Sequence, residues 1–136
     1  MTDKEISLLL PDYDPNTQSL DSTFGSDEAM RAVEFFNLFL KHHKGKWAGE
    51  KFVLSDWQIS VVANMFGWIR PDGTRRYRSS LIELPRKSGK SHLAAGLALY
   101  CLVADSEQGA EVYTAAADRD QANIVFNIAK RFVESD

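Results

Sequence analysis

The sequence contains a single cysteine, Cys101, among 136 residues. One thiol excludes an internal disulfide and a cysteine-based metal site, and it favours a reducing compartment. Cys101 stands in an apolar run, so it is interpreted as a core residue and not as a nucleophile. Charge of one sign is not in large excess either, because the formal net charge is only −3. This balance indicates neither a strongly acidic nor a strongly basic partner for the chain as a whole.

Long hydrophobic runs are also missing. The N-terminal stretch MTDKEISLLLPDYDP has too short an apolar run for a secretory signal, and the longest run, Leu93–Ala104, falls short of a membrane span. These absences predict a cytoplasmic protein without a membrane partner. The first 25 residues are rich in turn-forming residues and show no periodicity, which predicts an extended arm over 1–25.

Two helices are predicted in the first half of the chain. In SDEAMRAVEFFNLFLKHHKG, Ser26 is a plausible N-cap and Gly45 follows the last turn. Adjacent helical residues point in different directions, so His42 and His43 are interpreted as a solvated helix end and not as metal ligands. In LSDWQISVVANMFGWIR, apolar residues recur at helical spacing and Ser55 is the expected N-cap.

The second half alternates between strand and helix patterns. RSSLIELP (78–85) and AEVYTAA (110–116) predict buried strands, whereas 91–104 predicts a helix buried against a sheet. The last segment predicts a helix that Asp118 caps and whose apolar side carries the residues Ile124, Val125, Ile128 and Phe132. This order favours an α/β fold with a parallel sheet and crossover helices. Two strands are few for such a sheet, so we expect the N-terminal part of a longer protein.

The segment between the first strand and its helix, ELPRKSGKS, ends like a phosphate-binding loop but lacks the glycine that usually opens one. Leu84 stands at that position. A strand, a loop with Gly-Lys-Ser and an apolar helix form the context in which backbone N–H groups converge on phosphates. There Lys90 would reach the β- and γ-phosphates and the hydroxyl of Ser91 would join a Mg²⁺ shell. In the alternative interpretation Gly89 is a turn glycine and Lys90 a solvated lysine, which leaves a cation unexplained at a helix N-terminus.

Several motifs at matching spacings extend beyond this loop: KGKWAG, WQ before a helix ending in FGW, RKSGKS, LALYCLVAD and GAEVYTAAADRDQA. From about residue 30 to the C-terminus the sequence resembles the start of the ATPase domain of tailed-phage terminase large subunits. In that family the loop commonly lacks its first glycine and carries an arginine. The resemblance therefore implies that Leu84 is a family variation and that nucleotide binding is retained.

The resemblance also implies roles for individual residues. A deviant Walker A loop would consist of Arg86, Lys87, Ser88, Gly89, Lys90 and Ser91. Arg86 and Lys90 would be the catalytic residues, with Arg86 acting on the γ-phosphate as an arginine finger does, and Ser91 would contribute to the metal site. Gln58 would recognise adenine through its side-chain amide. A capping box with Ser55 is the alternative for Gln58, and the two roles are compatible.

For the chain as a whole, the resemblance implies an incomplete P-loop, RecA-like parallel sheet with flanking helices and an N-terminal helical lead-in. Residues 26–136 would be the N-terminal part of the ATPase domain, truncated before Walker B, so the chain alone is expected to be inactive. The function would be ATP-driven translocation of viral DNA into procapsids in the cytoplasm of a bacterial host. Expected cofactors are ATP and Mg²⁺, and expected partners are double-stranded DNA, the portal protein, the terminase small subunit and further copies of the chain. The alternatives are another P-loop motor, such as a helicase-like ATPase, and a non-catalytic remnant that serves as an interaction module.

A basic cluster stands out in an otherwise acidic chain and comprises Arg70, Arg75, Arg76, Arg78, Arg86, Lys87 and Lys90. Arg75, Arg76 and Arg78 follow the turn-forming PDG at 71–73. Phosphate neutralisation by such residues would support DNA contact. The alternative is a solvated turn.

Overall fold

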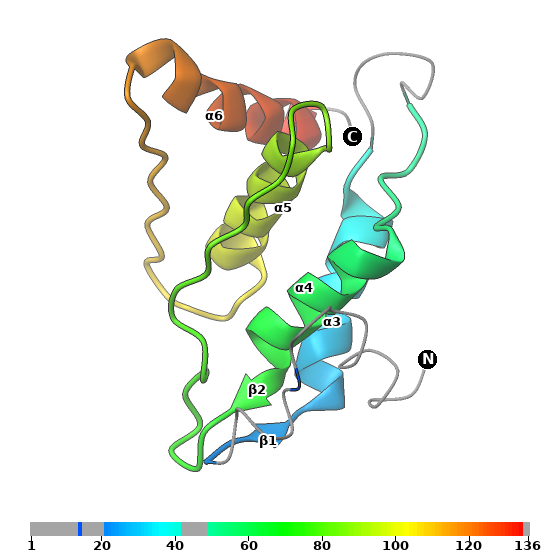
Figure 1. The fold of residues 1–136 in the computed structure, drawn as a ribbon, viewed down its shortest axis with the longest axis vertical. Coiled ribbons are helices and arrows are strands. Elements are labelled where there is room, and N and C mark those ends of the chain that lie inside the picture. Colours follow the sequence, from blue (N-terminus) through cyan, green and yellow to red (C-terminus); the bar gives the residue numbers. More distant parts are fainter. Residues whose placement is uncertain (1–13, 15–20, 42–48, 135–136) are drawn as a thin grey trace. The chain divides into compact units, whose positions relative to one another are not determined.

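The computed structural model describes Asp14 and residues 21–41 and 49–134. They form an α/β arrangement in two compact units, Met1–Asn37 with Val53–Ile82 and Leu38–Phe52 with Glu83–Asp136. The elements, labelled in Figure 1, are β1 (Thr23–Phe24), α3 (Ser26–Phe39), α4 (Asp56–Gly67), β2 (Trp68–Ile69), α5 (Lys90–Val103) and α6 (Arg119–Glu134). The α/β class is thus confirmed.

Helix α3 follows Gly25, whose carbonyl oxygen accepts the N–H of Ala29 at 3.1 Å. Ser26 is therefore the first helical residue and not the N-cap. The side chains that α3 buries lie on one stripe at spacings of three and four, which is why the segment folds as an amphipathic helix. They are Ala29, Ala32, Val33, Phe35 and Phe36. The helix ends at Phe39, before the expected end near Gly45, and His42 and His43 lie outside the described residues.

The sheet within the described residues is two-stranded and antiparallel, with Phe24 opposite Trp68 and Thr23 opposite Ile69. The Phe24 and Trp68 rings meet edge to face with their centroids 5.3 Å apart. Next to the strands, the N–H of Gly25 donates to the carbonyl oxygen of Gly67 at 2.7 Å. A Cβ at Gly67 would lie 2.5 Å from the Phe24 ring and 3.0 Å from the Cβ of Ala29. Only glycine permits this close approach.

Helix α4 begins at Asp56 with Ser55 as its N-cap, as predicted. It ends at Gly67, so the expectation that the helix includes Trp68 was wrong. The backbone of Trp68 instead pairs with β1. The indole N–H of Trp68 donates to Oδ1 of Asn64 at 2.9 Å, and Nδ2 of Asn64 donates to the carbonyl oxygen of Ser60 at 2.8 Å. These three buried residues satisfy one another along the helix.

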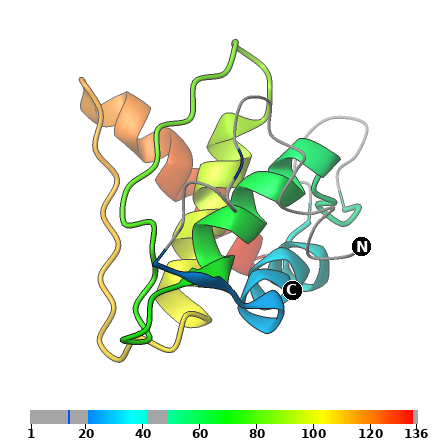
Figure 2. The ribbon, with the colours of Figure 1, turned by 60° about the horizontal axis from the view of Figure 1, so that its bottom comes forward.

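In the second unit α6 packs across α5 (Figures 1 and 2). Leu93, Leu99 and Tyr100 are the large buried side chains of α5, and Phe132 is the buried residue of α6. The carboxylate of Asp118 accepts the N–H of Gln121 at 2.8 Å, which confirms the predicted cap. Ile124 was placed on the apolar side of this helix but is half exposed. A helical partner thus covers α5, where the sequence pattern had predicted a sheet.

The predicted strands at 78–85 and 110–116 carry no strand structure, and the described residues contain no parallel sheet. A strand is defined by hydrogen bonds to a neighbour, and neither segment has a neighbouring strand in the described part of the chain. Most of their side chains are accordingly exposed to solvent, with Leu81 85% and Tyr113 82% exposed. The apolar pattern of these segments is typical of buried strands, but in this structure their large apolar residues Leu81 and Tyr113 are exposed.

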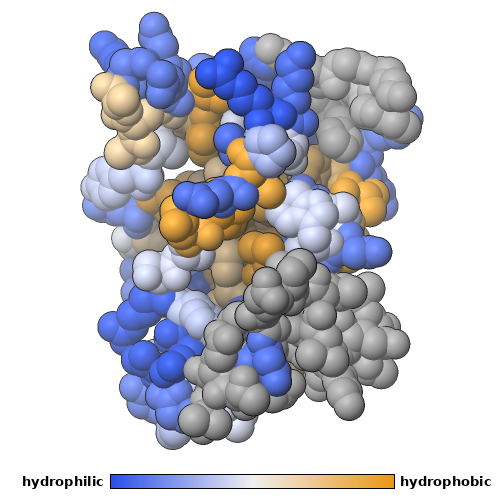
Figure 3. Space-filling model, viewed as in Figure 1, coloured by the Kyte–Doolittle hydropathy of each residue, from blue (hydrophilic) through white to orange (hydrophobic). Residues whose placement is uncertain are grey.

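Exposed apolar side chains occur in both units. Figure 3 shows patches of hydrophobic residues between hydrophilic ones on the face that it presents. In the second unit the large exposed apolar residues include Leu38, Phe39, Leu102, Val103, Val112, Tyr113, Ile124, Phe126 and Val133. Single exposed apolar residues are ordinary, but a set of this size within one small unit is typical of a surface that another chain segment or partner covers.

Candidate nucleotide-binding loop

The loop before α5 has an unusual backbone. Lys87 and Gly89 both have positive φ, 64° and 80°, and Gly89 occupies the N-cap position of α5. Glycine adopts this left-handed conformation without cost, whereas a lysine does so only in tight turns or strained sites. The two residues turn the chain sharply between Pro85 and Lys90, so the loop leads directly into the helix N-terminus.

The start of α5 offers backbone donors to a ligand. The N–H of Leu93 donates to the carbonyl oxygen of Gly89 at 3.0 Å, and this is the first hydrogen bond of the helix. Helical geometry leaves the N–H groups of Lys90 and Ser91 without intrahelical acceptors. Such a helix end attracts anions through both its donors and its dipole. The donor chemistry therefore fits a phosphate group.

Side chains of the loop bind its own backbone. The Nζ atom of Lys90 donates to the carbonyl oxygen of Leu84 at 3.0 Å, and the hydroxyl of Ser88 donates to the carbonyl oxygen of Pro85 at 2.5 Å. Lys90 is exposed, so this bond is open to competition from a ligand. The ammonium of Lys90 folds back across the loop, where it can exchange a carbonyl oxygen for a phosphate oxygen.

The structure brings the predicted loop residues together in one turn. Arg86, Lys87, Gly89 and Lys90 are exposed, while Ser88 and Ser91 are partly buried. Arg86, Lys87 and Lys90 thus bring three positive charges within five residues at the start of a helix, and like charges repel one another. An anionic ligand relieves that repulsion, which favours phosphate over a neutral ligand.

Gln58 belongs to the other unit, in the first turn of α4. Its Oε1 atom accepts the backbone N–H of Ser55 at 2.9 Å and the hydroxyl of Ser55 at 3.1 Å. Only 7% of Gln58 is exposed. The capping interpretation is therefore confirmed for the carbonyl end of this amide. Recognition of adenine stays a prediction.

Metal ligands are sparse in the part of the chain that the structure describes. No group of three or more His, Cys, Asp or Glu residues is placed there to hold a metal ion. The hydroxyl of Ser91, in the first turn of α5, is the one predicted metal ligand. No helix among the described residues is long and apolar enough to cross a membrane.

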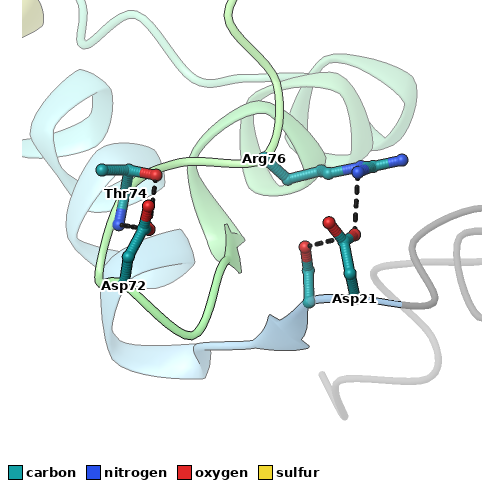
Figure 4. A network of polar contacts seen from close by, with 5 residues as sticks. Asp21, Asp72, Thr74 and Arg76 are labelled. Carbon is teal, nitrogen blue, oxygen red and sulfur yellow. Dashed lines mark hydrogen bonds and ion pairs between the residues drawn. The ribbon is translucent and has the colours of Figure 1, made fainter.

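The basic residues after α4 are tied into the first unit to different extents. The guanidinium of Arg75 lies over the Phe66 ring, 5.0 Å from its centroid. The guanidinium of Arg76 forms an ion pair with the carboxylate of Asp21 at 2.7 Å (Figure 4). The backbone N–H of Arg76 donates to the carbonyl oxygen of Trp68 at 2.8 Å. Arg78 is exposed. Of the three, Arg78 is the most available to a ligand, whereas Arg75 and Arg76 also serve the fold.

A short polar turn precedes these arginines. The hydroxyl and the backbone N–H of Thr74 donate to Oδ1 of Asp72 at 2.6 and 2.9 Å (Figure 4). The hydroxyl bond first, and the backbone bond second, lower the pKa of Asp72 below its ordinary value. The same two bonds from Thr74 fix the turn that leads to Arg75 and Arg76.

Sequence reasoning missed two long-range contacts. The Asp21–Arg76 pair joins residues 55 positions apart, and no local pattern signals it. His92, directly after the predicted loop, stacks on Phe52 with ring centroids 6.2 Å apart. The only available signal for His92 was an aromatic ring inside an apolar helix next to Ser91.

The chain matches known proteins over most of its length. Residues 56–136 match the family of the terminase large subunit, ATPase domain. The chain belongs to this family. The resemblance to terminase large subunits that the sequence motifs indicated is thus confirmed. A second comparison supports it: the chain is 31% identical over 104 residues to the protein named terminase, large subunit, of Enterobacteria phage HK97.

The second match covers most of this chain but only a small part of the relative. It covers 76% of the chain but only 20% of the phage HK97 terminase, so the chain spans about a fifth of the length of that relative. No solved structure matches the chain significantly. Within the terminase match, α4, the predicted loop, α5 and α6 all fall inside the family region.

Proposed function

We propose that this chain is the ATP-binding part of a viral DNA-packaging motor, the terminase large subunit, which couples ATP hydrolysis to translocation of double-stranded DNA into procapsids. The observation that carries the proposal is the position of Lys90. Its ammonium lies over a sharply turned loop at a helix N-terminus, in a chain of the terminase ATPase family.

In this proposal the phosphates of ATP bind at the start of α5. The N–H groups of Lys90 and Ser91 donate to phosphate oxygens, and the Lys90 ammonium leaves the carbonyl oxygen of Leu84 to join them. Arg86 acts on the γ-phosphate, where charge changes most during hydrolysis. The remaining loop residues, Lys87, Ser88 and Gly89, shape the backbone and add positive potential.

Mg²⁺ fits this loop in part. The Ser91 hydroxyl is the residue that would hold the ion, which would neutralise charge on the phosphates when bound. We assign recognition of the adenine base to Gln58. Its Oε1 atom is occupied by Ser55, which leaves the amide N–H₂ as the group that donates to adenine.

The finer fold and the partners belong to the same proposal. The predicted strand segments 78–85 and 110–116 stand on either side of α5 in the sequence, as they would in a RecA-like strand–loop–helix–strand unit with a parallel sheet. The packaging function implies the portal protein, the terminase small subunit, further copies of the chain and the bacterial host cytoplasm.

Calorimetric titration with ATP and Mg²⁺ tests the nucleotide site. Lys90→Ala should abolish detectable binding, because it removes the charge that reaches the phosphates. Lys130→Ala is the matched control, since Lys130 is an exposed lysine of α6 in an exposed pair with Glu134. Equal ATP affinity for the wild type and Lys90→Ala would refute the phosphate-loop assignment.

A further inference from the structure

Three aromatic rings form a cluster beside the first turn of α5. Phe52 and His92 are stacked with an interplanar angle of 9°, and Phe132 meets each of them edge to face. All three centroid separations are 6.2 Å. Phe52 and Phe132 are almost fully buried, and His92 is partly buried. The imidazole is therefore held on one face and against one edge by rigid apolar neighbours.

The two phenylalanines are themselves anchored, and they come from distant parts of the second unit. The N–H of Phe52 donates to the carbonyl oxygen of Leu40 at 2.8 Å, which attaches this segment to the residue after α3. Phe132 lies in the last turn of α6 and is the buried residue of that helix. The cluster thus ties the beginning of α5 to the end of α6 and to the segment before α4.

The place of His92 on α5 gives this contact a consequence for the loop. Successive helical residues are rotated by about 100°, so His92 points about 200° away from Lys90 and about 100° away from Ser91. The ring of His92 is therefore fixed on one side of the first turn while Lys90 projects on the other. Holding that ring sets the rotation of the first turn about the helix axis, and with it the direction of the N–H groups at the helix start.

The contacts of the imidazole with Phe52 and Phe132 restrict its orientation, and helical geometry puts His92 on the side of α5 away from Lys90. The contribution of His92 is thus one of orientation. An ordinary buried residue deeper in α5, such as Leu99, packs in the same unit but stands two turns away from the loop.

We propose that His92 is a positioning residue of the nucleotide site, whose stacked contact with Phe52 and edge-to-face contact with Phe132 hold the first turn of α5 in the orientation that presents its N–H groups to phosphate. The inference rests on the proposed function for its nucleotide chemistry. The orientation itself is a property of the chain without nucleotide. The two parts are therefore tested separately.

Hydrogen exchange of the full chain without nucleotide tests the orientation. His92→Ala should raise the exchange rates of the amides of residues 90–93 about tenfold relative to the rest of α5, because the first turn loses its anchor. His92→Phe should retain the slow rates, since a phenyl ring can make the same stacked contacts. Leu99→Ala is the matched control and should speed exchange around its own position without a selective effect on the first turn.

Titration with ATP and Mg²⁺ tests the consequence for binding. His92→Ala should weaken ATP binding about tenfold, because small misplacements of positioned groups are costly. His92→Phe should restore affinity to within about twofold of the wild type, a rescue that loss of a histidine-specific proton or ligand would not allow. Leu99→Ala should lower the thermal midpoint by at least as much as His92→Ala while leaving affinity within about twofold.

Two results would overturn the proposal. One is unchanged exchange of residues 90–93 in His92→Ala, and the other is an equal loss of affinity in His92→Ala and Leu99→Ala. If His92→Ala does not fold, Phe132→Leu removes the ring edge at similar volume and should reproduce both effects in weaker form. If the wild type binds no ATP, the proposed function fails, and the exchange measurement still decides whether His92 positions the helix start.

Discussion

The ammonium of Lys90 lies 3.0 Å from the backbone carbonyl oxygen of Leu84, the residue that stands where a phosphate loop usually has its first glycine. The contact uses the main chain of Leu84 and makes no demand on its side chain. A non-glycine residue at this position is therefore compatible with a lysine folded across the loop. This geometry gives a physical reason why the altered motif can retain its role.

Restoring the glycine should accordingly have little effect. Leu84→Gly keeps the carbonyl oxygen that Lys90 contacts, and the added backbone freedom costs about 0.4–1 kcal/mol. We expect ATP affinity within about fivefold of the wild type by calorimetric titration. A gain or loss of a hundredfold would show that the side chain of Leu84 takes part in the site.

Arg86 should matter more to hydrolysis than to binding. Its side chain is exposed beside the loop, and its charge is most useful where negative charge shifts in the transition state. In a terminase assembly with measurable phosphate release, Arg86→Ala should lower the turnover rate by at least about a thousandfold. The ATP dissociation constant should change by less than about tenfold. Equal losses in both quantities would make Arg86 an ordinary phosphate anchor, and Lys130→Ala provides the control.

The two roles of Gln58 separate in their measurements. Gln58→Ala removes the acceptor for the Ser55 N–H and should lower the free energy of unfolding by about 1 kcal/mol. If the amide also reads adenine, the same variant should lower the preference for ATP over GTP. Ser55→Ala is the matched control, because it weakens the cap and leaves the Gln58 amide in place. An unchanged base preference in Gln58→Ala, together with the stability loss, would leave only the cap.

Much of this local chemistry can be predicted from the sequence. Ser55 and Asp118 were identifiable as caps because a cap depends on residues three positions apart. The strands could not be assigned in the same way. Trp68 continues the helical spacing of α4, yet it starts β2 because Phe24, 44 positions earlier in the chain, supplies its pairing partner.

In the candidate site, too, features set by neighbouring residues could be predicted and features set by distant residues could not. Gly89, Lys90 and Ser91 were recognisable from a contiguous motif, because the loop and the helix start are neighbours in sequence. The left-handed conformation of Lys87 could not be predicted from the motif, since lysine has no preference for positive φ. The aromatic cluster around His92 could not be predicted from the sequence, because Phe52 and Phe132 lie 40 residues to either side of His92. Contacts of that range are set by packing in three dimensions.

The close approach at Gly67 is open to a double-mutant test. Gly67→Ala places a methyl group against the Phe24 ring and Ala29, which should lower the free energy of unfolding by about 1–3 kcal/mol. Phe24→Ala creates space on one side, so the double variant should lose less than the sum of the single losses. Denaturant unfolding of the three variants measures this coupling. Strict additivity would contradict the close contact between Gly67 and Phe24.

The arginines after α4 should respond differently to substitution. Arg78→Ala removes an exposed charge and should reduce the salt dependence of DNA binding by about one contact, with no loss of stability. Arg75→Ala removes the contact with the Phe66 ring and should lower the free energy of unfolding by about 0.5–1 kcal/mol. Binding to a DNA duplex at several salt concentrations, together with thermal midpoints, separates the two. DNA affinity that is unaffected by Arg78→Ala would favour the solvated turn.

The buried chain of hydrogen bonds from Ser60 through Asn64 to Trp68 also determines which pairing of β1 and β2 is acceptable. The observed register sets Phe24 opposite Trp68 and leaves the indole N–H on Asn64. A slip of one residue would turn the Trp68 side chain to the opposite face of the strand. Asn64 would then remain in the interior without its donor, at a cost of about 1–3 kcal/mol. Two strands of two residues each are too short to define their own alignment, so the polar partner on the neighbouring helix selects one arrangement by penalising the others.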